Sequence, residues 1–258
     1  MRELLDAVAD GDVSPAEAEA RLNGYATTEA GRFDAAREER TGVPEAVLAD
    51  GKTTAEVADL AATAVETTGR ALCTRVDDPT AETVTTALAE EFPDSNVEYD
   101  ERARTLVAHA PAFDPPALDA DVGVVAAGTA DAAAAGEAAT TLTEMGARVT
   151  RVSDVGVAGL HRTIDALADL RAMDVLVVAA GREGALPTVL AGLVDVPIIG
   201  LPVASGYGHG GAGEAALAGM LQSCAPVTVV NVDAGYAAGV QAGLVARSVD
   251  SARTDGRR

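Results

Sequence analysis

The second half of the chain alternates apolar runs with alanine-rich runs. Val175–Ala180 and Val196–Leu201 have the length and composition of buried strands, and alanine-rich runs of helical length separate such segments from Asp121 onward. A strand–helix alternation predicts right-handed βαβ units, which build a parallel sheet. We therefore expect an α/β domain with an open parallel sheet and helices on both faces over residues 116–250.

Polar residues gather where each of these strands is expected to end. The clusters are Gly128–Asp131, Ser153–Asp154, Ala180–Gly184, Ala204–His209 and Asn231–Asp233. In open parallel sheets, ligands bind in the crevice outside the carboxyl ends of the strands. The sequence therefore predicts a ligand site at this edge of the sheet.

The first half has a different pattern of short helices and strands. Ser14-Pro15-Ala16-Glu17 is a capping box with proline at the first helical position, and Thr53 or Thr54 begins a helix that Gly69 ends. A helix over residues 81–91 and strands over 71–76, 97–99 and 105–108 complete the pattern. We expect a small α+β module over residues 1–115, with a proline-containing linker, and a disordered tail over residues 251–258.

Composition narrows the class of protein. The 258 residues are enough for a well-buried core, and they carry a net charge of −21 with Lys52 as the single lysine. High salt screens the self-repulsion of such a chain, so we expect a halophilic protein, with an ordinary acidic enzyme as the alternative. No basic cluster is present that could neutralise rows of phosphates, which argues against nucleic acid and anionic membranes as partners.

The chain reads as a cytoplasmic protein with free thiols. The charged N-terminus lacks a signal-peptide pattern, and no apolar run reaches the roughly 20 residues that a membrane helix needs. Two cysteines, Cys73 and Cys224, are too few for a disulfide framework.

Two residues are candidates for catalysis, and each also has a structural interpretation. Cys224 is flanked by small residues and follows a predicted helix C-terminus, which disfavours a thiolate, so a core role is open beside a nucleophilic one. Glu183 stands at a helix start, where an acid favours the helix dipole, or it transfers protons. Cys73 lies inside a strand run and is expected in the core.

The binding candidates have similar alternatives. Asp131 is either the N-cap of a helix over residues 132–145 or a ligand of a ribose hydroxyl. His161 and Arg162 are a surface pair or, for the arginine, a fork for a carboxylate or phosphate. The glycine-rich segment 205–213 can turn backbone N–H groups toward an anion.

Three loops of the C-terminal half resemble those of the aminoimidazole ribonucleotide carboxylases, the PurE class. They are Gly128–Asp131, Gly159–Thr163 and Ala180–Pro187. The last loop departs from the family pattern, because Ala185 stands where the family has its catalytic histidine and Glu183 lies two residues earlier.

A second resemblance covers nearly the whole chain and is more specific. The chain is similar to the PurE-like LarB family in segments 34–45, 74–76, 154–162 and 183–187, and in Ser223-Cys224-Ala225 before residues 229–233. The resemblance implies a flavodoxin-like, PurE-type parallel sheet preceded by the α+β module, and a homo-oligomer that is octamer-like as in PurE-type proteins. The small residues over 130–136 and 234–244 are expected to pack helices closely at subunit contacts.

The LarB resemblance also implies a reaction, the first step of nickel-pincer cofactor synthesis. Nicotinic acid adenine dinucleotide is carboxylated at C5 of its pyridinium ring and its phosphoanhydride is hydrolysed, giving pyridinium-3,5-biscarboxylic acid mononucleotide and AMP. The cysteine matching Cys224 is the nucleophile, and the acid matching Glu183 assists. CO2 or bicarbonate is the co-substrate.

The remaining candidates stand at a strand end or in the N-terminal module. Asp233 is a candidate to hold Mg2+ or another divalent cation, or to orient a water, for the hydrolysis. Arg37 and Arg40 either reach the dinucleotide phosphates or pair with Glu38 and Glu39. The candidate substrate-binding residues are Thr129, Asp131, His161, Arg162, Ser205, Gly206, Asn231, Asp233, Arg75, Arg37 and Arg40.

Two other functions stay open. One is an aminoimidazole ribonucleotide carboxylase or mutase of purine biosynthesis, against which the alanine at position 185 argues. The other is a non-catalytic nucleotide-binding protein that kept the fold.

Overall fold

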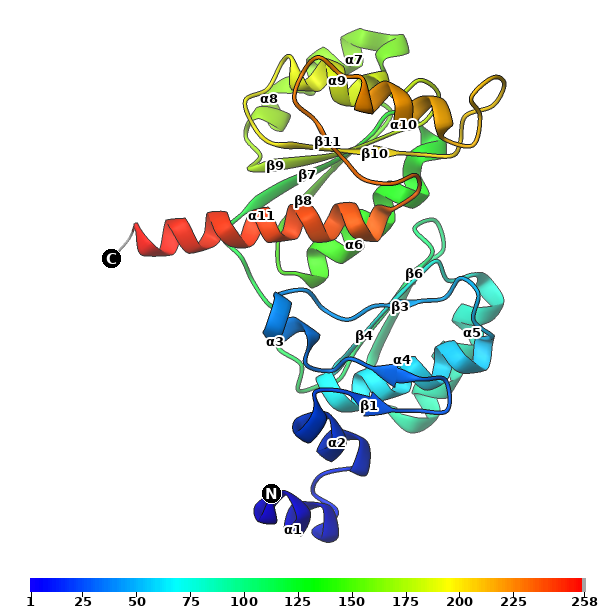
Figure 1. Cartoon of the computed structure of the whole chain (residues 1–258), viewed down its shortest axis with the longest axis vertical. Helices are drawn as coiled ribbons and strands as arrows, with labels where there is room; N and C mark the ends of the chain where they lie inside the picture. The colour runs from blue at the N-terminus through cyan, green and yellow to red at the C-terminus, as the bar shows by residue number, and fades with distance from the viewer. Residues whose placement is uncertain (257–258) are drawn as a thin grey trace. The chain divides into compact units, whose positions relative to one another are not determined.

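A computed structural model describes residues 1–256 and divides the chain into two compact units (Figure 1). The division falls between Asp114 and Pro115, inside the proline-containing linker. An N-terminal unit therefore precedes a larger C-terminal unit.

The N-terminal unit is an α+β module. Its elements are α1 Arg2–Asp10, α2 Pro15–Asn23, β1 Ala26–Thr27, β2 Arg32–Phe33, α3 Arg37–Thr41, β3 Val47–Leu48, α4 Thr54–Thr68, β4 Arg70–Thr74, α5 Asp78–Glu91, β5 Asn96–Asp100 and β6 Thr105–His109. A four-stranded sheet has the order β3-β4-β6-β5, in which only the β3–β4 pair is parallel. Helix α4 packs against α5 and β4.

Local capping explains where these helices begin and end. Thr53 accepts a hydrogen bond from the backbone N–H of Glu56, whose carboxylate accepts from the Thr53 N–H in return. The Ser14 hydroxyl accepts from the Glu17 N–H at 3.0 Å in the same way. Gly69 ends α4 in the left-handed conformation, with φ 75°. The predicted helix starts at Ser14 and Thr53 are confirmed because they depend on neighbours in the sequence. The helix predicted over residues 81–91 begins earlier, at Asp78, after the N-cap Asp77.

The C-terminal unit is a parallel α/β sheet. Its elements are β7 Asp121–Ala126, the 3-10 turn η1 Thr129–Asp131, α6 Ala132–Glu144, β8 Arg148–Val152, the 3-10 turn η2 Val157–Gly159, α7 Leu160–Asp165, α8 Leu167–Arg171, β9 Val175–Ala180, α9 Ala185–Ala191, β10 Ile198–Pro202, α10 Glu214–Leu221, β11 Thr228–Val229 and α11 Gly235–Asp255. The strand order β11-β10-β9-β7-β8 is the flavodoxin-like order, and every pair is parallel. The predicted fold class is confirmed.

Helices cover both faces of this sheet because alternate strand residues point to opposite sides. Val122, Val124 and Val177 pack in one apolar core with residues of α6 and α11. Val125 and Val178 pack in the other core with residues of α8, α9 and α10. Burial on both faces explains why these strands read as uninterrupted apolar runs.

The small residues of α6 and α11 serve packing inside one chain (Figure 1). A Cβ on Gly239 would lie 2.7 Å from the Ala138 carbonyl oxygen and 2.8 Å from the Thr141 Cβ. Gly235 and Gly243 are similarly close to α6 and to Met145. The glycines of α11 therefore face α6 within the chain, and the expected packing of these helices at subunit contacts stays a prediction. The homo-oligomer itself stays a prediction.

The expectation of a disordered tail from residue 251 is also wrong as far as residue 256, because α11 continues to Asp255. The Arg253 guanidinium donates to both carboxylate oxygens of Asp174, at 2.9 and 2.7 Å, and to the Asp119 carbonyl. The Asp250 carboxylate accepts from the Asp119 N–H at 2.9 Å. These contacts hold the last turns of α11 against the segments that precede β7 and β9. Residues 257 and 258 lie outside the described part.

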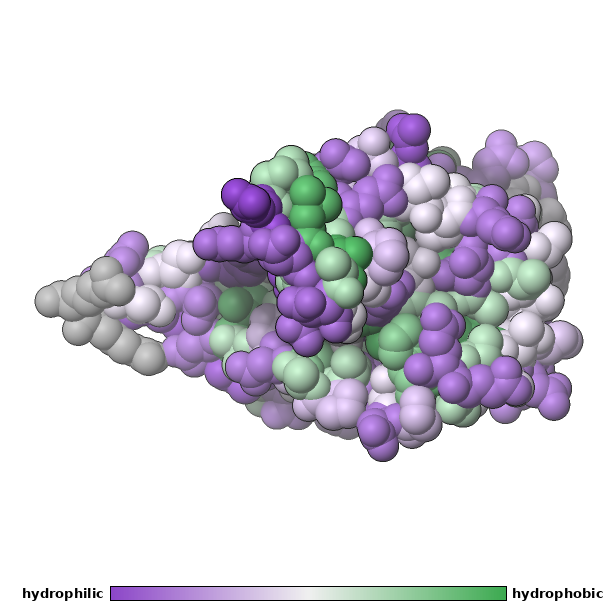
Figure 2. All heavy atoms as spheres, turned by 90° about the horizontal axis from the view of Figure 1, so that it is seen from below, coloured by the Kyte–Doolittle hydropathy of each residue, from purple (hydrophilic) through white to green (hydrophobic). Residues whose placement is uncertain are grey.

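Hydrophilic side chains are frequent on the surface of the protein. On the face in Figure 2, hydrophilic residues predominate and apolar residues form small separate groups, as 40 acidic residues would produce. In residues 1–256, no helix combines the length and the apolar character that crossing a bilayer requires.

Candidate active site

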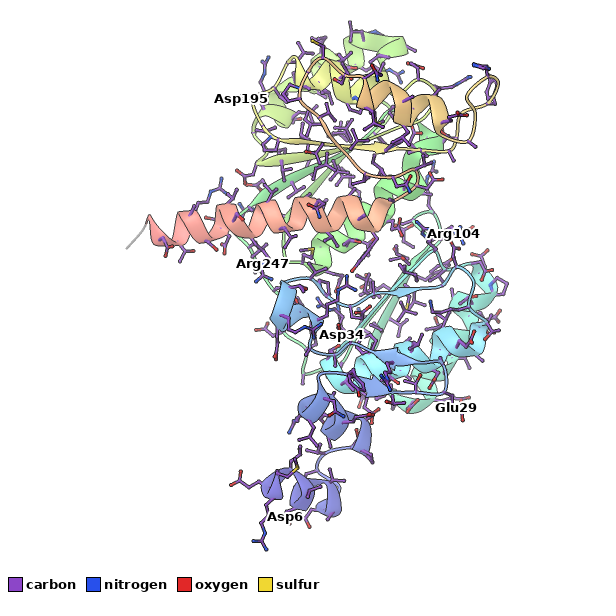
Figure 3. All side chains as sticks on the ribbon, in the orientation of Figure 1. Asp6, Glu29, Asp34, Arg104, Asp195 and Arg247 are labelled. Atoms are coloured by element: carbon purple, nitrogen blue, oxygen red, sulfur yellow. The ribbon has the colours of Figure 1, made fainter. Side chains whose placement is uncertain are left out.

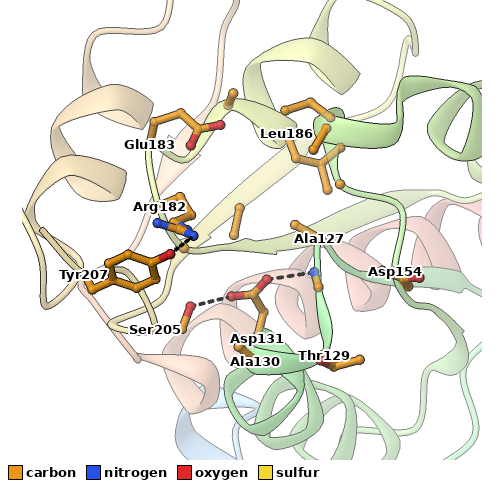
Figure 4. A pocket seen from close by; sticks show the side chains of 17 residues that line it. Ala127, Thr129, Ala130, Asp131, Asp154, Arg182, Glu183, Leu186, Ser205 and Tyr207 are labelled. Atoms are coloured by element: carbon orange, nitrogen blue, oxygen red, sulfur yellow. Dashed lines mark hydrogen bonds between the residues drawn. The ribbon is translucent and has the colours of Figure 1, made fainter.

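A cavity of about 740 Å³ opens at the carboxyl ends of the strands in the C-terminal unit (Figure 4). The loops after β7, β8, β9 and β10 form its wall, as expected for an open parallel sheet. Its lining residues are Ala127, Gly128, Thr129, Ala130, Asp131, Asp154, Gly156, Val157, Ala158, Ala180, Gly181, Arg182, Glu183, Ala185, Leu186, Ser205 and Tyr207.

Asp131 joins two of these loops. Its buried carboxylate accepts a hydrogen bond from the Gly128 N–H at 2.8 Å and one from the Ser205 hydroxyl at 2.9 Å (Figure 4). Asp131 precedes α6 but makes no side-chain hydrogen bond to its first turn. Asp131 therefore stands at the N-cap position of α6, as one interpretation predicted, but its carboxylate does not cap the helix. The two hydrogen bonds hold the carboxylate in one orientation at the cavity wall instead.

The turn after β9 brings Arg182 and Glu183 to the cavity. Arg182 and Gly184 have left-handed backbones, with φ 53° and 65°, and both Arg182 and Glu183 are exposed. Helix α10 packs directly on this turn, because a Cβ on Gly219 would overlap the Glu183 carbonyl oxygen. Only a glycine at position 219 allows this approach.

Arg182 and Tyr207 form a pair across the cavity wall (Figure 4). An Arg182 Nη2–H donates to the Tyr207 hydroxyl at 2.7 Å, and the guanidinium carbon lies 3.9 Å from the centroid of the ring. Tyr207 is 75% exposed and belongs to the glycine-rich loop after β10. Neither residue was among the sequence candidates, although the arginine stood inside the recognised loop.

Four sequence candidates line the cavity: Thr129, Asp131, Glu183 and Ser205. Gly206 is not a lining residue, but it packs against the turn after β9. A Cβ added to Gly206 would lie 3.2 Å from the Arg182 backbone nitrogen.

Four further candidates are outside the lining of the cavity. His161 is exposed on α7, and Arg162 pairs with Asp154, whose carboxylate does line the cavity. The Asn231 side chain accepts from its neighbouring N–H at 2.8 Å. The Asp233 carboxylate accepts from the Ala204 N–H at 3.0 Å, so it supports the start of the loop after β10.

Asp233 alone does not form a metal site. Within the described part of the chain, no group of three or more histidine, cysteine, aspartate or glutamate side chains could hold a metal ion. Magnesium is often bound by one or two carboxylates together with substrate phosphates and water. A magnesium ion here would therefore depend on the substrate for most of its ligands.

The two cysteines have opposite environments. Cys73 is buried in β4, and burial raises the pKa of its thiol to about 12, which keeps it protonated. Cys224 is exposed and follows the end of α10, outside the lining of the cavity. The core interpretation of Cys224 is therefore wrong, and its role as a nucleophile stays a prediction.

The three arginine candidates of the N-terminal unit each pair with a carboxylate. Arg37 donates to Glu45, Arg75 donates to Asp50 at 3.1 Å, and Arg40 makes a two-pronged contact with Asp34. Asp34 is labelled in Figure 3. The Arg40 guanidinium lowers the pKa of the Asp34 carboxyl through these hydrogen bonds. The predicted pairing of Arg37 and Arg40 with Glu38 and Glu39 is wrong, because the partners come from outside α3.

Comparison with protein families gives two matches. A family model described as the LarB/PurE-like N-terminal domain matches residues 25–110. A model described as AIR carboxylase matches residues 121–256. The two matches follow each other along the chain and correspond to its two units.

Two individual proteins are also similar. An uncharacterized protein of Methanocaldococcus jannaschii is 38% identical over 254 residues, which cover 96% of this chain and 97% of that protein. A crystal structure of a PurE2 variant from Treponema denticola is 22% identical, with a TM-score of 0.40, and the match covers 56% of this chain and 92% of that one.

Proposed function

The chain belongs to the LarB family of PurE-like proteins, whose members are carboxylase-type enzymes, and we propose that it acts on nicotinic acid adenine dinucleotide. The enzyme carboxylates C5 of the pyridinium ring and hydrolyses the phosphoanhydride. The products are pyridinium-3,5-biscarboxylic acid mononucleotide and AMP, in the first step of nickel-pincer cofactor synthesis. The observation that carries this proposal is the match to a LarB/PurE-like N-terminal domain ahead of the AIR carboxylase match.

Covalent catalysis makes the carboxylation chemically feasible. A pyridinium ring is electron-poor and does not attack CO2. The Cys224 thiolate adds to C4, and the resulting dihydropyridine has an enamine-like C5 that forms a bond to the carbon of CO2. A base then takes the C5 proton, the C4–S bond breaks, and the electron pair returns to the thiolate as the ring regains aromaticity.

Glu183 fits the role of the proton-transfer group. Its carboxylate is exposed at the cavity wall, where a bound ring can be reached. The proposal places the pyridinium at this wall, and it requires the Cys224 segment, which is outside the cavity lining, to approach the bound ring. The contact between Gly219 of α10 and the Glu183 backbone supports this arrangement, because α10 leads directly to the segment that carries Cys224.

Hydrolysis of the phosphoanhydride needs an oriented water. Asp233 is the candidate group, directly or through a divalent cation held by the substrate phosphates. Its carboxylate supports the loop after β10, so its loss is expected to affect that loop as well as the hydrolysis.

The test is an assay of products in high salt. Purified protein is incubated with nicotinic acid adenine dinucleotide, labelled bicarbonate and magnesium, and the products are identified by mass spectrometry. AMP and a singly labelled dicarboxylated mononucleotide are expected from the wild type. Cys224→Ser and Glu183→Gln are expected to lose the labelled product, whereas the matched control Cys73→Ala retains it.

Two outcomes would contradict the proposal. Intact dinucleotide bound without turnover would favour a nucleotide-binding protein. Turnover of aminoimidazole ribonucleotide instead would favour the purine carboxylase, which is the alternative that the AIR carboxylase match allows.

A further inference from the structure

The cavity carries more negative than positive side chains. Its lining includes the carboxylates of Asp131, Asp154 and Glu183, whereas Arg182 is the single cation among the lining residues, all of which lie in the described part of the chain. Arg162, which is outside the cavity lining, forms an ion pair with Asp154 and so offsets its charge. The Asp131 carboxylate is stabilised by the two hydrogen bonds that it accepts. An anionic group of a ligand in this cavity therefore has one cationic side chain on its wall to bind.

The backbone of Arg182 does not favour an arginine. Its φ of 53° lies in the left-handed region, which is unfavourable for residues with a Cβ and is occupied most readily by glycine and asparagine. Non-glycine residues in this region concentrate at functional sites. The presence of arginine is therefore better explained by what its side chain binds than by the turn that it occupies.

The side chain lies against an aromatic ring. The guanidinium lies over Tyr207, 3.9 Å from the ring centroid, and within residues 1–256 its one hydrogen bond goes to the Tyr207 hydroxyl. A guanidinium has five N–H donors in a planar fork, so most of them are available to a ligand. This fork matches the two oxygens of a carboxylate.

We propose that Arg182 recognises the carboxylate on C3 of the pyridinium ring and thereby selects nicotinate over nicotinamide substrates. This inference rests on the proposed function, since it concerns the ring that the proposed reaction modifies. A carboxylate accepts two hydrogen bonds from the fork. A carboxamide accepts at one oxygen and turns its own N–H donors toward the guanidinium, which is also a donor.

The position of Arg182 beside Glu183 gives this recognition a second effect. C3 and C5 lie on either side of C4 in the ring, so a C3 carboxylate held at Arg182 fixes the direction in which C5 points. Glu183, the next residue of the same turn, is the group proposed to move the C5 proton. Arg182 is thus a specificity-determining residue that also orients the ring for the reaction.

Calorimetric titration with nicotinic acid mononucleotide and nicotinamide mononucleotide tests the inference. The wild type is expected to prefer the nicotinate ligand by about 10- to 100-fold, the range of charge-assisted hydrogen bonds. Arg182→Asn keeps a residue that tolerates the left-handed backbone but removes the cation, and it is expected to bring the preference close to one. Arg182→Lys keeps the charge without the fork and is expected to retain part of the preference.

Tyr207→Phe is the matched control for a purely structural role. It removes the hydrogen bond to Arg182 but leaves the cation, so the preference for nicotinate should persist. An unchanged preference in Arg182→Asn would overturn the inference, as would an equal loss in Tyr207→Phe, since Arg182 would then only tether the loop. Thermal unfolding of each variant verifies that it is folded.

The outcome is separable from that of the proposed function. If the wild type turns over the dinucleotide but binds both mononucleotides equally, only the assignment of Arg182 fails. If neither mononucleotide binds and no labelled product forms, the proposed function fails with it.

Discussion

The contact between Gly181 and Ser205 allows a quantitative test of the cavity wall. A Cβ on Gly181 would overlap the Ser205 hydroxyl oxygen and would lie 3.2 Å from a carboxylate oxygen of Asp131. Gly181→Ala is therefore expected to turn the hydroxyl away and to break its 2.9 Å hydrogen bond to Asp131. The backbone itself can accept alanine, because Gly181 is not among the residues with positive φ.

The expected loss of stability is small but measurable. A hydrogen bond to a charged group contributes about 1.5–3 kcal/mol, and the lower end applies because water can reach the exposed Ser205. Replacing glycine with alanine stabilises the fold by about 0.5 kcal/mol, because alanine lowers the conformational entropy of the unfolded chain. Gly181→Ala should therefore reduce the free energy of unfolding by ~1 kcal/mol. In a chain of this size, that corresponds to a fall in Tm of about 2–4 °C.

A double-mutant cycle measured by denaturant unfolding isolates the contact. Ser205→Ala alone should cost about 1.5 kcal/mol through the lost hydrogen bond. In that background no hydroxyl remains to collide with, so the added Gly181→Ala should be neutral or slightly stabilising. If the two single effects add within about 0.5 kcal/mol, the substitutions are independent and the proposed collision is refuted.

Four further predictions concern other parts of the chain. Gly239→Val should destabilise the C-terminal unit by about 1–3 kcal/mol, because the contacts with α6 leave no space for a side chain; unchanged unfolding would contradict this. Hydrogen bonds from Arg148 lower the pKa of Asp121. Asp121→Asn should therefore reduce stability above about pH 4, and the stability difference between variant and wild type should disappear as pH falls further. A stability difference that does not change with pH would argue against the ion pair between Arg148 and Asp121. A thiol reagent followed by peptide mapping should label Cys224 and spare Cys73 in the folded protein. Raising the salt concentration should raise Tm, because salt screens the repulsion among the acidic side chains that give the chain its net charge of −21. A salt-independent Tm would argue against a halophilic protein.

The features that depend on near neighbours could be predicted from the sequence. The capping box at Thr53, the apolar runs of β9 and β10, and the clustering of polar residues at the strand ends all follow from spacing along the chain. The cavity accordingly lies at the predicted edge of the sheet.

The features that depend on distant contacts could not be predicted. The hydrogen bond between Ser205 and Asp131 spans 74 residues, and that between Arg182 and Tyr207 spans 25 residues. No periodicity in the sequence indicates which loop side chains will meet. The final turns of α11 look like a polar tail in the sequence, because the partner of Arg253 is Asp174, which lies 79 residues earlier in the chain.

A competition experiment tests the central claim most directly. The protein is offered nicotinic acid adenine dinucleotide and aminoimidazole ribonucleotide together with 13C-bicarbonate, and mass spectrometry locates the label. The account predicts the label in a dicarboxylated pyridinium mononucleotide that appears together with AMP. Label in a carboxylated imidazole ribonucleotide, with the dinucleotide intact, would contradict it.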